Sequence, residues 1–118
     1  MQLPLQVSFR HMEPSPAVEA LVREKAARLD RFASRIMSCR VVIEQSSHRH
    51  QQGNHFEVRI DITLPEGEVV AGREPSKHRE YRDVEVAIRD AFSAAARQLE
   101  DYVRRQRGAV KTASPARR

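Results

Sequence analysis

Four stretches of the chain have the pattern of hydrophobic and polar residues that is typical of β-strands. Residues 3–9 alternate with a period of two, and Pro4 places this half-buried strand near an edge. Residues 39–44 (CRVVIE) are rich in β-branched side chains, which favour strands. Residues 56–64 alternate most clearly, and after a turn at 65–68 the pattern predicts a short returning strand at 69–73.

Two further stretches have the periodicity of amphipathic helices. The first begins at Ser15, which suits an N-cap with Pro16 in the first turn, and is predicted to run to about residue 36. Its apolar stripe consists of Val18, Leu21, Val22, Leu29, Phe32, Ala33 and Ile36. The second helix is predicted over 83–107, with Asp83 as N-cap and Gly108 where helices commonly stop. Its apolar stripe consists of Val84, Ile88, Ala91, Ala95, Leu99, Tyr102 and Val103.

The predicted order of elements is therefore β-α-β-β-β-α, which indicates an α+β domain. A four-stranded sheet with both helices packed on one face would bury all the apolar stripes. The other face of the sheet would be solvated, and it would carry Glu57, Arg59, Asp61 and Thr63. Residues 1–108 form the predicted domain. Residues 109–118 (AVKTASPARR) lack periodicity and are expected to be a disordered basic tail.

Basic residues gather on one flank of each predicted helix. In the first helix, Arg28, Arg31 and Arg35 lie together, and Lys25 lies at the edge of the apolar stripe. Around the second helix, five arginines fall within an arc of roughly 80° opposite the apolar stripe. These five are Arg82, Arg89, Arg97, Arg104 and Arg107, and Arg105 adds a further charge in the last turn. We call these ten side chains the basic helix residues.

The charge balance indicates that the basic helix residues bind a polyanion. The chain has a net charge of +5 and a pI near 10.1. Aromatic residues make up only 5% and tryptophan is absent, which argues against binding through stacked bases. The alternative is a solvated helix face covered with salt bridges, since Glu85, Asp90, Glu100 and Asp101 lie nearby.

Patterns that carry catalytic or metal chemistry are missing from the sequence. We find no paired carboxylates, nucleophile elbow or glycine-rich phosphate loop, so we expect neither an enzyme nor a cofactor. Three histidines, His48, His50 and His55, lack the partners of a tetrahedral metal site. We interpret them as part of a mobile polar loop, with RNA contact by protonated imidazoles as the alternative.

The cysteine count and the hydropathy of the chain indicate the cellular compartment in which we expect the protein. The single cysteine, Cys39, excludes an internal disulfide and fits a reducing cytosol, where we expect it to be a buried thiol. No apolar run approaches the roughly 18 residues that a membrane span needs. The first residues also lack the features of a signal peptide, so we expect a soluble, cytoplasmic protein without a membrane partner.

Two segments resemble a known family. Residues 23–44 (REKAARLDRFASRIMSCRVVIE) and 87–108 (AIRDAFSAAARQLEDYVRRQRG) are similar to bacterial ribosome hibernation-promoting factors, which include the ribosome-associated inhibitor. This family is also called the ribosomal subunit interface or sigma-factor modulation family, and the resemblance covers roughly residues 2–108. It implies a fold like a double-stranded-RNA-binding domain. It also implies docking in the decoding region of the small ribosomal subunit, which blocks the tRNA and mRNA sites during stress or stationary phase.

The resemblance also implies which residues and partners are involved. The RNA-facing positions of the family match Lys25, Arg28 and Arg31 on the first helix, and Arg89, Arg97, Arg104 and Arg105 on the second. The implied partners are the small ribosomal subunit and its rRNA, without a small-molecule substrate. Away from the ribosome we expect a monomer.

The chain departs from the family pattern in three ways. The loop at 74–83 (EPSKHREYRD) is longer than usual, the segment from Asp83 to Asp101 contains five acidic residues with both ends counted, and no C-terminal dimerisation domain follows. Two other functions stay open at this stage. The basic surface could bind an acidic stress or transcription regulator as a protein-interaction module, or the domain could bind RNA duplexes away from ribosomes.

Overall fold

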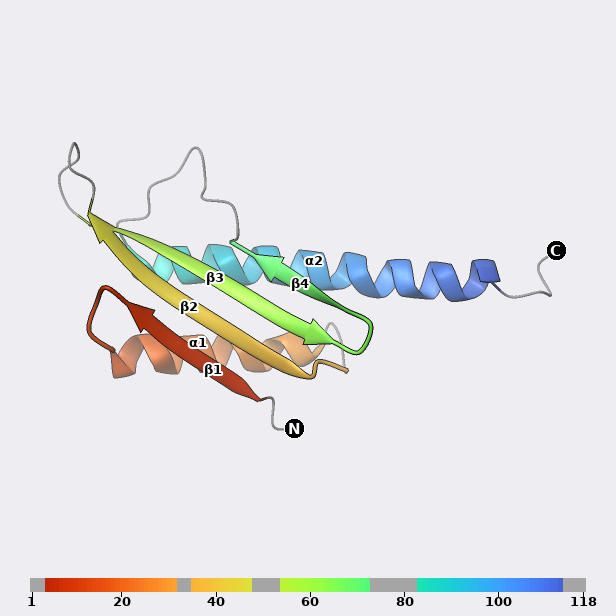
Figure 1. The fold of residues 1–118 in the computed structure, drawn as a ribbon, viewed down its shortest axis with the longest axis horizontal. Coiled ribbons are helices and arrows are strands. Elements are labelled where there is room, and N and C mark those ends of the chain that lie inside the picture. Colours follow the sequence, from red (N-terminus) through yellow and green to blue (C-terminus); the bar gives the residue numbers. More distant parts are fainter. Residues whose placement is uncertain (1–3, 32–34, 48–53, 73–82, 114–118) are drawn as a thin grey trace.

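Two helices cover one face of a four-stranded β-sheet (Figure 1). This computed structural model describes residues 4–31, 35–47, 54–72 and 83–113. In chain order, the elements are β1 (Leu5–Arg10), α1 (Pro16–Arg28), a 3₁₀ turn η1 (Leu29–Arg31), β2 (Ser38–Ser47), β3 (Asn54–Leu64), β4 (Gly67–Ala71) and α2 (Val84–Ala113). The α+β class and the order of elements that the sequence predicts are therefore confirmed.

The strands lie in the sheet in their chain order, β1-β2-β3-β4. β1 and β2 are parallel, with Leu5 opposite Cys39, whereas the β2–β3 and β3–β4 pairs are antiparallel. Parallel neighbours need a crossover connection, and α1 supplies it on the face that α2 also covers. α2 packs on β3 and β4 and also contacts α1, so the sheet and both helices form one two-layer unit.

The core lies between the sheet and the two helices. Side chains of alternate strand positions reach it, as the period of two requires, and the helices contribute their apolar stripes. Its largest fully buried side chains are Ile43, Ile60, Ile62, Ile88, Leu99, Val22 and Val41. On the opposite face of the sheet, Glu57, Arg59 and Thr63 are exposed and Asp61 is half-buried, which confirms that this face is solvated.

Both helices begin at the predicted N-caps. The Val18 N–H donates to Ser15 Oγ at 3.3 Å, and the Glu85 N–H donates to Asp83 Oδ1 at 2.9 Å. Each bond satisfies one of the backbone donors that the first turn of a helix leaves without an intrahelical partner. These local signals fix where the amphipathic segments start.

The first helix is shorter than its apolar pattern predicts. It ends at Arg28, η1 follows, and Ile36 is buried in the connection to β2 rather than in a helix. The chain must reverse direction before β2 begins at Ser38, so the turn has to come before residue 36. Phe32 and Ala33, which were also predicted in the stripe, lie outside the described residues.

The second helix is longer than predicted and extends past one end of the sheet (Figure 1). It continues to Ala113, because a glycine such as Gly108 weakens a helix by only about 1 kcal/mol and does not have to end it. Of the predicted tail, residues 109–113 are thus helical, and 114–118 lie outside the described residues. Within the described part of the chain, neither helix has the length and apolar character that crossing a lipid bilayer requires.

Candidate nucleic-acid interface

Nine of the ten basic helix residues lie in the described part of the chain. Arg82 lies outside it. Lys25 is half-buried on α1, and the other eight are exposed. These eight are Arg28 on α1, Arg31 in η1, Arg35 before β2, and Arg89, Arg97, Arg104, Arg105 and Arg107 on α2.

On α2 the arginines lie on the side that faces away from the sheet. Ile88, Ala95 and Leu99 are fully buried against the strands. At about 100° per residue, Arg89, Arg97, Arg104 and Arg107 then fall on the opposite side of the helix, where all four are exposed. Arg105 follows Arg104 by one position, so it lies on a different flank. The second helix therefore carries one row of four guanidinium groups.

α1 contributes to the same layer of the molecule. Val22, Ala26 and Leu29 anchor α1 and η1 in the core, which leaves Arg28 and Arg31 exposed. The two helices lie beside each other on one face of the sheet (Figure 1). Their outward sides therefore belong to one helical surface, as the hypothesis of a shared basic surface requires.

Three of these arginines are paired with carboxylates of their own helix. The N–O distances are 3.1 Å for Arg28 with Glu24, 4.0 Å for Arg89 with Glu85 and 3.4 Å for Arg104 with Asp101. Exposed pairs of this kind are worth about 1 kcal/mol or less, so a phosphate group can compete for the guanidinium. Salt bridges within each helix thus form at three of the arginines, as the alternative interpretation predicts, but they are too weak to prevent these arginines from binding phosphate.

The remaining basic side chains make no ion pair with another described residue. They are Lys25, Arg31, Arg35, Arg97, Arg105 and Arg107. Two exposed carboxylates, Glu100 and the Asp101 that pairs with Arg104, lie on the same side of α2 as Arg97 and Arg104, together with the half-buried Asp90. The helical surface is consequently basic, although carboxylates lie between Arg97 and Arg104 in its arginine row.

The side chains that could support covalent or metal chemistry do not form a site. Cys39 is buried, and this burial, together with the nearby Asp61 carboxylate, raises the pKa of its thiol from 9.0 to about 12. The thiol is therefore protonated at neutral pH and unsuited to nucleophilic attack. Among the described residues, no three His, Cys, Asp or Glu side chains are placed to hold a metal ion. His48 and His50 lie outside the described residues, and only the backbone of His55 is described, in β3.

A second group of arginines lies on the open face of the sheet, where sequence reasoning expected only a solvated surface. Arg10, Arg40 and Arg59 come from three neighbouring strands and are all exposed. Their alternation with apolar residues places each of them on this face. The sequence does not reveal that they come together, because this depends on the order and register of the strands.

The fold and the helical surface together define an α+β protein that presents a layer of exposed basic helices, as nucleic-acid-binding domains do. The family model described as "Sigma 54 modulation protein / S30EA ribosomal protein" matches residues 5–107. The chain belongs to this family, which confirms the resemblance seen in the sequence.

Two solved structures have the same fold. The first is the N-terminal domain of Thermus thermophilus Protein Y, with a TM-score of 0.61 and 22% sequence identity, covering 86% of this chain and 99% of that one. The second is a ribosomal subunit interface protein from Coxiella burnetii, with a TM-score of 0.67 and 17% identity, covering 85% of this chain and 97% of that one. A search among curated proteins gives no significant match.

Proposed function

We propose that this protein is a ribosome-associated translation inhibitor without enzymatic activity. Its basic helix residues bind rRNA in the decoding region of the small ribosomal subunit, and its body occupies the space that tRNA and mRNA need during stress or stationary phase. The chain belongs to a family whose description includes a ribosomal protein, S30EA, and this membership supports the function. So does the similarity in fold to a protein described as a ribosomal subunit interface protein.

The observation that carries the proposal is the shared helical surface of α1 and α2. Arginines of both helices are exposed on the layer that faces away from the sheet. Guanidinium groups bind phosphate oxygens through two parallel hydrogen bonds. Folded RNA presents its backbone and shape more readily than its base edges, so a row of arginines suits it better than aromatic side chains would.

The inhibition we propose is steric and electrostatic. The arginines and Lys25 neutralise rRNA phosphates and hold the domain in place, while the rigid two-layer body excludes the anticodon stem of tRNA. No bond is formed or broken, so inhibition ends when the protein dissociates. Because each neutralised phosphate releases counterions, binding should weaken steeply as salt rises.

The direct test is co-sedimentation with purified small subunits at moderate salt. The variant carrying Arg89→Glu and Arg97→Glu should lose most of its binding. The matched control carries Arg10→Glu and Arg40→Glu, which make the same change in net charge on the open face of the sheet, and it should bind as the parent protein does. Retained binding by the helix variant would contradict the proposal, and an equal loss by both variants would mean that net charge alone determines binding.

A second measurement tests the site on the ribosome and the kind of partner. A labelled anticodon stem-loop bound to small subunits should be displaced by the parent protein and not by the helix variant. Failure to displace it, with binding intact, would place the protein outside the decoding region. If binding to a cellular partner survived complete nuclease digestion of the RNA, the partner would be a protein instead.

A further inference from the structure

The open face of the sheet carries a balanced set of charges, in contrast to the basic helical surface. Its described charged side chains are three arginines and four carboxylates: Arg10, Arg40, Arg59, Glu44, Glu57, Asp61 and Glu68. A phosphate backbone laid over this face would meet carboxylates as often as guanidinium groups. A face that intersperses both signs of charge is instead complementary to a partner that itself carries both signs, as a protein segment can.

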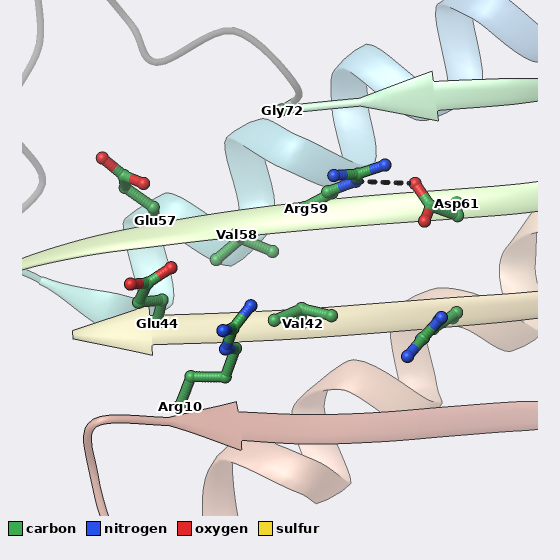
Figure 2. A pocket seen from close by; sticks show the side chains of 9 residues that line it. Arg10, Val42, Glu44, Glu57, Val58, Arg59, Asp61 and Gly72 are labelled. Atoms are coloured by element: carbon green, nitrogen blue, oxygen red, sulfur yellow. Dashed lines mark hydrogen bonds and ion pairs between the residues drawn. The ribbon is translucent and has the colours of Figure 1, made fainter.

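A hollow of about 330 Å³ lies in the middle of this face (Figure 2). Val42 of β2 forms its apolar floor, and Gly72, directly after β4, contributes no side chain to fill it. Arg59 lies between them on β3, but its Nε is held 3.0 Å from Asp61 Oδ1. The Arg59 side chain is thereby directed along its own strand, which leaves room for an apolar group above Val42.

One end of the hollow carries an arginine that has no partner in the described part of the chain. Arg40 is exposed and lies opposite Asp61 in the β2–β3 register, yet Asp61 pairs with Arg59 instead. Arg40 makes no ion pair with any described residue. Its guanidinium is therefore available to a carboxylate from outside.

The other end of the hollow carries two carboxylates side by side, with Arg10 of β1 next to Glu44 (Figure 2). Arg10 is exposed and makes no ion pair with a described residue. Glu44 and Glu57 are directly opposite each other in the β2–β3 register, an arrangement that is unfavourable for like charges. His11 Nε2 approaches Glu44 at 3.6 Å, whereas Glu57 is exposed and makes no ion pair with a described residue. A cation placed between the two carboxylates would relieve their repulsion.

The charges of this hollow therefore follow a fixed order along β2. Arg40, Val42 and Glu44 occupy alternate positions of the same strand, so the cationic and anionic ends are separated by about 13 Å. An extended peptide with residues at i, i+2 and i+4 spans the same distance. Its side chains at those positions also project to one face, as this surface requires.

We infer that the hollow is a docking site for an extended segment of a partner protein. A carboxylate of the segment pairs with Arg40, an apolar side chain lies over Val42, and an ammonium or guanidinium group lies between Glu44 and Glu57. The site is on the opposite side of the sheet from the basic helix residues, so both surfaces can be occupied at once. If the helices bind rRNA as proposed above, this site would allow a protein partner to bind the same chain at the same time.

The test is a titration of the full chain, followed by amide chemical shifts in NMR, with the blocked peptide Glu-Ser-Leu-Ser-Lys. Saturable shifts are expected at β2 and β3 around Val42 and Glu57. The control peptides Lys-Ser-Leu-Ser-Lys and Glu-Ser-Ser-Ser-Lys, which lack the carboxylate and the apolar side chain, should bind several-fold more weakly. Shifts that do not saturate, that map to the helices, or that are the same for all three peptides would overturn the inference.

Charge reversal within the site provides the sharper readout. Arg40→Glu should weaken binding of Glu-Ser-Leu-Ser-Lys by about tenfold and strengthen binding of Lys-Ser-Leu-Ser-Lys, because the carboxylate then favours a lysine at that end. Arg97→Glu on α2 makes the same change of charge on the other surface and should leave both affinities unchanged. Loss of the first peptide without a gain for the second would overturn the assignment of Arg40.

Discussion

The ring of Tyr102 lies directly against the backbone of Gly67. A Cβ atom at position 67 would be 3.3 Å from Tyr102 Cε2 and 3.4 Å from its Oη. Gly67 begins β4, and Tyr102 is among the last residues of α2 that pack against the core. This contact therefore lies near the point beyond which α2 extends past the sheet.

The contact between Gly67 and Tyr102 predicts a coupling between two substitutions. Gly67→Ala should lower the free energy of unfolding by about 1 kcal/mol, because the packed ring would have to move by a few tenths of an ångström to accommodate the methyl group. In a Tyr102→Ala background, the same substitution should be neutral or slightly stabilising, since alanine restricts the unfolded chain. Urea unfolding of the four proteins measures the coupling. An equal effect of Gly67→Ala in both backgrounds would contradict the prediction.

Gly72 should tolerate substitution much less than Gly67. Its φ angle is +75°, in the region that favours glycine, and a Cβ atom there would overlap the backbone carbonyl oxygen of Val58. Backbone atoms of a paired strand cannot move aside as a side chain can. We expect Gly72→Ala to lower the free energy of unfolding by about 3 kcal/mol. A loss no larger than that of Gly67→Ala in the same urea experiment would refute the comparison.

Arg97 and Arg89 should contribute unequally to the salt dependence of ribosome binding. Arg97 makes no ion pair with a described residue, whereas Arg89 lies 4.0 Å from Glu85. Arg97→Gln should therefore reduce the slope of log K against log salt by about one, as expected for one lost phosphate contact. Arg89→Gln should reduce it by less. Binding measured from low to moderate salt gives both slopes, and an equal or larger change for Arg89→Gln would contradict this ranking.

Cys39 should resist thiol reagents in the folded protein. Burial raises the pKa of the thiol from 9.0 to about 12, so the reactive thiolate is scarce near pH 8. Labelling with a thiol reagent should be slow in buffer and fast in urea. Comparable rates in the two conditions would show that the side chain is accessible.

The same shift predicts how stability depends on pH. The folded state retains the thiol proton that the unfolded state loses above about pH 9, so the contribution of Cys39 is complete below pH 9. It decreases as the pH rises toward 12. The variant Cys39→Ala should lack this part of the alkaline dependence, and identical pH profiles for parent and variant would contradict the shift.

Much of the fold could be predicted because its signals are local. Ser15 and Asp83 cap their helices through side chains that bond backbone donors two or three residues away. Alternation identified β1 and β3, β-branched side chains identified β2, and the turn at 65–68 indicated β4. The end of the first helix could not be predicted, because the apolar pattern continues to Ile36 while the chain must turn earlier to enter β2. Ala26, Ala87 and Phe92 joined the core without being predicted, since their burial depends on how the helices pack.

The basic surface was predictable in part for the same reason. Helical periodicity places Arg89 and Arg97 opposite the core, and the spacing of Glu85 and Arg89 already indicates an ion pair. The open face was not predictable. Asp61 can pair with Arg59 on its own strand or with Arg40 on the next, and only the side-chain geometry shows which arginine is left without a partner.

The length of α2 has a consequence for the energetics of binding. Val103 is the last described residue of α2 that packs against the core, and the following turns extend past the sheet with three arginines, at 104, 105 and 107 (Figure 1). Helical turns without tertiary contacts open at little free-energy cost. An anion that binds these arginines must therefore also restrict the conformational entropy of this end. In a calorimetric titration with an anionic ligand, ordering of this end of α2 should release heat in addition to that of the ligand contacts. The gain in affinity should be smaller than three added charges would suggest, because the ordering costs entropy.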